Sequence, residues 1–110
     1  MTDEKYTKQF YVAGVKFREG WKENIKSLEE GEELLLVPEP TNKFDRYAIQ
    51  IHGVGTGEPV MLGYVPAKTG EANEVSNLLQ RAIPLKATLI ELQPDFEPWN
   101  ALLVEVEEVE

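Results

Sequence analysis

The sequence predicts a mainly β fold with inserted helices, built as an OB-like small antiparallel barrel of about six strands. Two observations support this class. Six short runs are rich in β-branched and aromatic residues, and the regular strand–helix alternation of a parallel α/β sheet is missing. The chain has 110 residues, which suits a single core and is too short for two. We therefore predict one domain over residues 1–110, with no internal repeat.

The six predicted strands are short and are mostly bounded by glycine or proline. They cover residues 8–15, 32–40, 47–54, 60–66, 84–92 and 101–109. In the last of them Leu102, Val104 and Val106 alternate with more polar positions, which predicts a strand near 101–107 that is half buried at most. The glycine-rich segment at 53–59 predicts a loose hairpin connection.

Two segments carry apolar residues at helical spacing. The clearer helix is predicted near 67–82, where a proline leads in and the apolar positions are Val75, Leu78, Leu79 and Ala82. A shorter helix is predicted near 21–29, because Trp21, Ile25 and Leu28 fall on one face. Gly31 is a suitable stop for it.

The net charge of −9 argues, taken whole, against nucleic acid, because phosphate binding depends on Lys and Arg. The charge is unevenly distributed, however. Segments 1–22 and 43–68 are mildly positive, whereas segments 23–42 and 91–110 hold most of the acids, whose simplest role is solubility.

The sequence has no cysteine, so disulfides and thiol catalysis are excluded. Its longest apolar run, residues 34–37, is far too short to span a membrane, and the N-terminus lacks a signal pattern. We expect a soluble, cytoplasmic protein with no membrane partner.

Residues for catalysis are not grouped in any recognisable motif. The single histidine, His52, is best interpreted as a strand-end residue, and Ser27 and Ser76 lie in predicted helices without a nucleophile-elbow pattern. Neither a phosphate-binding loop nor an EF-hand spacing occurs. We therefore expect a protein that is not an enzyme, with no catalytic residue, no metal and no cofactor.

The segment EPTNKFDRYAIQI, residues 39–51, combines turn residues, an aromatic ring and two bases, and leads into an apolar strand. Together with GVKFREGW at 14–21 and MLGYVPAKTGEANEVSNLL at 61–79, in this order and spacing, it resembles a HIRAN domain. The family pattern is a G-x-x-aromatic turn, then a [DE]-P-x-N-x-aromatic-D-x-x-A-[IV] block, then a G-[YH]-[LVI]-[PK] strand end followed by a helix. The resemblance covers roughly residues 8–92.

The resemblance implies an OB-like barrel with helices. HIRAN domains occur in eukaryotic DNA-repair and fork-remodelling helicase-like proteins and as small free-standing bacterial or phage proteins, which this chain resembles. In the eukaryotic members the resemblance implies recognition of the free 3′-hydroxyl end of single-stranded DNA. An aromatic pair holds the terminal bases, an acid and backbone amides meet the hydroxyl, and basic and amide side chains contact phosphates.

Matched position by position, the family's basic–aromatic pair falls on Lys16 and Phe17. Its second aromatic falls on Phe44 and its hydroxyl-binding acid on Asp45. The implied DNA-binding residues are Lys16, Phe17, Asn42, Lys43, Phe44, Asp45, Arg46, Tyr64 and Lys68. The chain departs from the pattern in having Lys16 for the usual arginine and Tyr64 where histidine can stand. The family's C-terminal aromatic has only unaligned candidates, Phe96 and Trp99.

Simpler interpretations stay open. Phe17 and Phe44 are equally candidates for core packing, and Asn42 and Asp45 for turn residues that bond their own backbone. A second functional hypothesis is a protein-interaction module that keeps the barrel and has lost DNA binding. In that case the strand at 101–109 would pair edge to edge with a partner or a second copy.

Overall fold

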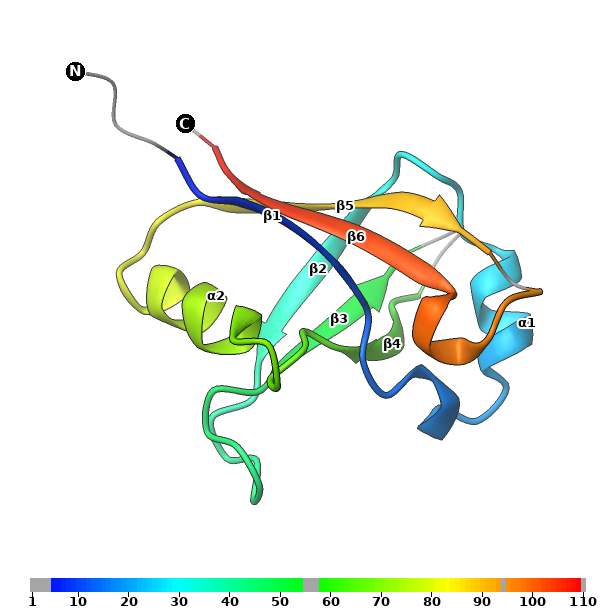
Figure 1. The fold of residues 1–110 in the computed structure, drawn as a ribbon, viewed down its shortest axis with the longest axis horizontal. Coiled ribbons are helices and arrows are strands. Elements are labelled where there is room, and N and C mark those ends of the chain that lie inside the picture. Colours follow the sequence, from blue (N-terminus) through cyan, green and yellow to red (C-terminus); the bar gives the residue numbers. More distant parts are fainter. Residues whose placement is uncertain (1–4, 55–57, 94, 110) are drawn as a thin grey trace.

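The computed structural model describes residues 5–54, 58–93 and 95–109, and its main feature is one curled antiparallel sheet (Figure 1). The strand order is β1-β6-β5-β2-β3-β4. The strands are β1 (Thr7–Tyr11), β2 (Glu33–Pro38), β3 (Ile49–Gly53), β4 (Val60–Tyr64), β5 (Leu85–Leu92) and β6 (Leu102–Glu108). The predicted mainly β, OB-like class with six strands is confirmed. The predicted hairpin connection at 53–59 includes residues 55–57, which lie outside the described residues.

The two outer strands of the sheet approach each other just beyond the end of β1. Ala13 and Tyr64 form an isolated antiparallel bridge, in which each backbone N–H donates to the other residue's carbonyl over 2.8 Å. Gly63 permits this approach, because a Cβ at this position would lie 2.3 Å from the Ala13 carbonyl oxygen. The bridge joins the first and fourth strands and closes the curled sheet at one end.

Two α-helices and two 3₁₀ helices complete the fold: η1 (Val15–Phe17), α1 (Trp21–Lys26), α2 (Glu71–Gln80) and η2 (Pro98–Asn100). Figure 1 shows α1 and α2 at opposite ends of the sheet. Both helices exist where the sequence predicts them, but α2 begins at 71 and not near 67. The reason is Gly70, whose left-handed φ of 95° precedes the helix and whose N–H bonds back to Ala67. No helix in the described part of the chain is long and apolar enough to cross a membrane.

The core is filled by the inward faces of the strands together with one face of each α-helix. Ile49, Ile51 and Leu89 are fully buried, and Ile25 of α1 and Val75 of α2 are packed into the same cluster. This burial is the main favourable term for folding, since it removes apolar area from water. The alternation of buried and half-buried positions in β3 follows from the two-residue period of a strand.

Strand β6 lies in the interior of the sheet, between β1 and β5. Its inward residues Leu102, Val104 and Val106 have no exposed surface. The strand prediction near 101–107 is therefore confirmed, but the hypothesis that this strand pairs edge to edge with a partner or a second copy is wrong. Both of its edges are already hydrogen-bonded, because β5 pairs with one edge and β1 pairs with the other.

Candidate functional site

The loop that joins β2 to β3, residues 39–48, projects away from the sheet (Figure 1). Backbone hydrogen bonds fix its base and its turns. The Glu39 N–H donates to the Ala48 carbonyl over 2.9 Å, and the Ala48 N–H donates to the Asp45 carbonyl over 3.0 Å. The loop is therefore an ordered hairpin connection.

Asn42 and Asp45 shape this loop through their own side chains. Asn42 Oδ1 accepts hydrogen bonds from the N–H groups of Phe44 and Asp45, over 2.9 and 3.0 Å. Asp45 Oδ1 accepts from the Tyr47 N–H over 2.8 Å. Short polar side chains that bond the backbone ahead of them stabilise turns of this kind. The turn interpretation of both residues is confirmed, and it leaves Asp45 Oδ2 without a hydrogen bond in the described part of the chain.

The two phenylalanines assigned by resemblance are both on the surface. Phe44 is 97% exposed and Phe17 is 71% exposed. The core-packing interpretation of these rings is therefore wrong. Large apolar side chains at such exposure contribute little to the folded core, so both rings are free for contact with a ligand.

A hollow of about 370 Å³ lies between the base of the loop, the end of β4 and the turn that precedes α2. Four of the predicted site residues line it: Asn42, Phe44, Asp45 and Tyr64. The remaining wall consists of small or apolar residues, namely Ala13, Ala48, Val65 and Ala67. The fold thus brings an exposed ring, a carboxylate and a phenol to one mostly apolar surface, although they come from separate segments.

Phe17 lies next to this hollow and is not part of its lining. A Cβ placed on Gly14 would be 3.9 Å from Tyr64 Cδ2 and 4.0 Å from Phe17 Cδ2, so the two rings flank this glycine. Gly14 has a φ of 72°, and its carbonyl accepts the Phe17 N–H that begins η1. Lys16 Nζ lies 5.1 Å from the centroid of the Phe17 ring, within the range of a cation–π contact. Lys16 and Phe17 therefore extend the Tyr64 side of the hollow.

Glu39, which the sequence analysis did not select, is the hydrogen-bonding centre behind the hollow. Its Oε1 accepts from Asn42 Nδ2 over 2.5 Å and from the Tyr64 hydroxyl over 3.1 Å, and its Oε2 accepts from Gln50 Nε2. The Asn42 bond first, then those of Gln50 and Tyr64, hold the pKa of the Glu39 carboxyl below its usual value. Partial burial, and then the bond to Glu39, raises the pKa of Tyr64. In the sequence Glu39 directly follows β2 and is the acid that opens the [DE]-P pattern, but nothing local indicates its bonds to Gln50 and Tyr64.

Comparison with known proteins identifies the architecture. The HIRAN domain matches residues 5–107 of the sequence. The chain belongs to the HIRAN domain family. Among solved structures, a protein from Lactobacillus plantarum superposes with a TM-score of 0.73 at 18% identity, covering 96% of this chain and 100% of that one. The HIRAN domain of human HLTF superposes with a TM-score of 0.66 at 16% identity, covering 93% of this chain and 74% of that one. No curated protein matches the sequence.

The other cations assigned by HIRAN resemblance belong to the loop and to the turn before α2, and they do not line the hollow. Lys43, Arg46 and Lys68 are all exposed. Arg46 stacks on its neighbour, with its guanidinium carbon 4.9 Å from the Tyr47 ring centroid, and Arg46 Nη2 donates to the Tyr47 hydroxyl over 2.7 Å. A role for these cations in binding therefore stays a prediction.

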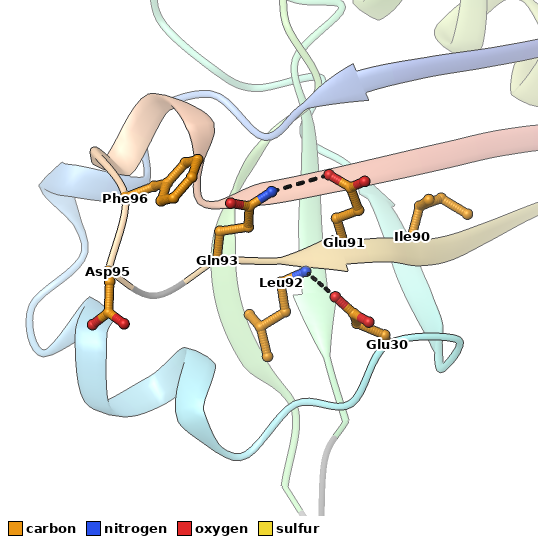
Figure 2. Close-up of a pocket in the computed structure, with 7 residues that line it drawn as sticks. All are labelled: Glu30, Ile90, Glu91, Leu92, Gln93, Asp95 and Phe96. Atoms are coloured by element: carbon orange, nitrogen blue, oxygen red, sulfur yellow. Dashed lines mark hydrogen bonds between the residues drawn. The ribbon is translucent and has the colours of Figure 1, made fainter.

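The HIRAN fold also leaves a second hollow, of about 590 Å³, beside the end of β5 (Figure 2). Three acids line it, Glu30, Glu91 and Asp95, together with the exposed ring of Phe96. Glu30 Oε2 accepts the Leu92 N–H over 2.9 Å, and Glu91 Oε2 accepts from Gln93 Nε2 over 3.1 Å. Among the described residues, no base lines this hollow. Phe96 and Trp99 are the two aromatic residues without an aligned family position. Phe96 lines this acidic hollow, whereas Trp99 lies on η2, which packs against η1.

Metal-binding groups are not assembled in the described ranges. No set of three or more His, Asp or Glu side chains there is arranged to hold an ion. His52 is half-buried on β3, with its Nε2 2.7 Å from Gln50 Oε1, so it belongs to the hydrogen-bonded group behind the first hollow.

Proposed function

We propose that this HIRAN domain is a non-enzymatic module that binds single-stranded DNA at a free 3′-hydroxyl end. The observation that carries the proposal is the ring of Phe44, which is 97% exposed at the edge of an apolar hollow. An aromatic face can stack on any base, and each such contact is worth roughly 1–3 kcal/mol. Family membership supplies the ligand class, since the motif residues of HIRAN domains fall on this loop.

Selectivity for the end of the strand follows from the chemistry of Asp45. A carboxylate accepts a hydrogen bond from a free hydroxyl, whereas it repels a terminal phosphate. Asp45 Oδ1 is occupied by the Tyr47 N–H, so the proposed acceptor for the hydroxyl is the other oxygen, Oδ2. The hollow between Asp45 and Tyr64 is where the terminal sugar would sit.

The exposed cations would hold the phosphates that precede the terminal nucleotide. Lys16 stands at the Tyr64 side, Lys43 and Arg46 belong to the loop, and Lys68 belongs to the turn before α2. Binding through these groups releases counterions and therefore weakens as salt rises. The acidic hollow near Phe96 is a poor alternative, because its three carboxylates would repel a phosphate backbone.

The second functional hypothesis, protein interaction through residues 101–109, loses its structural basis, because both edges of β6 are paired. We do not pursue it as the function of this domain.

Fluorescence anisotropy at low salt tests the proposal. A labelled single strand with a 3′-hydroxyl is titrated beside the same strand with a 3′-phosphate, and we expect tighter binding of the hydroxyl form. Phe44→Ala should weaken binding, and Phe96→Ala is a matched control that removes an equally apolar ring, 55% exposed, from the acidic hollow. Equal affinity for the two ends, or equal losses in the two variants, would rule the proposal out.

A further inference from the structure

Glu39 connects three separate elements through one carboxylate. The residue itself follows β2, and its side-chain donors are Asn42 in the loop, Gln50 on β3 and Tyr64 at the end of β4. Two of these three, Asn42 and Tyr64, line the hollow, whereas Glu39 does not. One side chain thus fixes the spacing between the loop and the β4 wall.

The contact to Asn42 continues into the residues that would meet DNA. Because Asn42 Nδ2 donates to Glu39, its Oδ1 is turned the other way and accepts the N–H groups of Phe44 and Asp45. The amide orientation is determined by these partners, since a carboxylate only accepts and an N–H only donates. The chain of hydrogen bonds therefore runs from Glu39 through Asn42 to the backbone that carries the exposed ring and the acid.

We propose that Glu39 is the positioning residue of the 3′-end site, holding Asn42, and through it Phe44 and Asp45, at a fixed distance from Tyr64. The inference rests on the proposed function for its ligand, but its structural part does not depend on DNA. Glu39 touches none of the bound strand in this scheme. It acts by limiting the conformations of the loop, so that less order is lost when DNA binds.

Charge alone predicts the opposite result. Removing an acid near a nucleic-acid site lowers the repulsion of phosphates and should strengthen binding. If Glu39 positions the loop, Glu39→Ala should instead weaken binding of the 3′-hydroxyl strand by about tenfold, as expected for losing hydrogen bonds that orient the site. Glu39→Gln, which keeps one oxygen to accept from Asn42, should recover part of this loss. Glu33→Ala is the matched control, because it removes an exposed acid from β2, the strand that directly precedes Glu39.

Nuclear magnetic resonance supplies a readout without DNA. In the wild type the side-chain amide signals of Asn42 should follow the ionisation of Glu39, and the Phe44 and Asp45 amides should be rigid. In Glu39→Ala the order parameters of those two amides should fall, while Glu33→Ala leaves them unchanged. Should Glu39→Ala fail to fold, Glu39→Gln is measured in the same way, and its Asn42 signals should lose their response to acid.

The outcomes are separable. Rigid Phe44 and Asp45 amides in folded Glu39→Ala, or Asn42 signals in the wild type that ignore acid, would overturn the positioning role whatever the DNA result. Loosened amides together with weaker binding support it. A wild type that binds neither strand end would overturn the proposed function and the site assignment with it, although the loop measurement would still support the contact between Glu39 and Asn42.

Discussion

The backbones of Ala13 and Tyr64 exchange two hydrogen bonds of 2.8 Å, and this pair joins the first part of the chain to the end of β4. Tyr64 and Ala13 also line the hollow, so the closure of the sheet and the wall of the candidate site are the same structure. The residue that makes the approach possible is Gly63.

Gly63→Ala should destabilise the domain by about 1–3 kcal/mol or more, as overpacking of a close contact does. The added Cβ would lie 2.3 Å from the Ala13 carbonyl oxygen and 2.7 Å from Val12 Cγ1, and backbone cannot move aside cheaply. Chemical denaturation measures the change. Gly20→Ala is the control, because Gly20 has no atom within 4 Å of its Cβ position and suffers only the strain of its left-handed φ of 69°. Similar losses in the two variants would contradict the closure argument.

Phe44→Ala should leave the free energy of unfolding within about 0.5 kcal/mol of the wild type, the range of ordinary surface substitutions. The ring is almost fully exposed and lies in no part of the core. DNA affinity should nevertheless fall by the value of one stacking contact, roughly 1–3 kcal/mol. Thermal denaturation and anisotropy on the same preparation separate the two effects, and a marked loss of stability would show that the ring packs inside the domain.

Acid should weaken the domain partly through Glu39. Its pKa in the folded protein is lowered from the ordinary value of 4.5, chiefly by the Asn42 hydrogen bond. A lowered pKa means that this stabilisation is complete above the unfolded value and is lost as pH falls through the folded one. Unfolding curves recorded from about pH 5 downward should therefore decline less steeply for Glu39→Gln than for the wild type. If stability fell equally steeply with pH in both proteins, the hydrogen bonds to Glu39 would not stabilise its ionised form.

The salt dependence of binding should report which cations contact phosphates. Each phosphate contact to a single strand contributes about 0.7 to the slope of log affinity against log salt. Lys16→Ala should reduce that slope by about this amount. Lys86→Ala removes an exposed cation from β5, away from the hollow, and should leave the slope unchanged. An unaltered slope for Lys16→Ala would remove this residue from the proposed site.

Local patterns predicted the elements of the fold well, because apolar periodicity and glycine or proline boundaries act within a few residues. All six strands and both α-helices lie where they were expected. The start of α2 was placed too early, since the left-handed conformation of Gly70 depends on how the turn packs and not on apolar spacing. The interior place of β6 could not be predicted either. This place results from the pairing of β6 with β1, which lies at the other end of the chain, and local sequence patterns do not show which distant strands pair.

The candidate site was predictable only where the motif was distinctive. Asn42, Phe44, Asp45 and Tyr64 do meet at one hollow. The exposure of Phe44 was not predictable, because an aromatic residue in a small barrel is more often in the core. Glu39 occupies the first position of the HIRAN pattern, but its partners on β3 and β4 are distant in sequence, so the pattern did not show its hydrogen bonds.

The seam at Ala13 and Tyr64 has a thermodynamic consequence. An oligonucleotide that touches the loop, Tyr64 and Lys16 at once would tether segments from both sides of the barrel's opening. Because the oligonucleotide binds only the folded domain, the melting temperature should rise with the logarithm of the free oligonucleotide concentration. A simple dye-based melting assay could consequently rank oligonucleotides by their chemical ends, without any label on the nucleic acid.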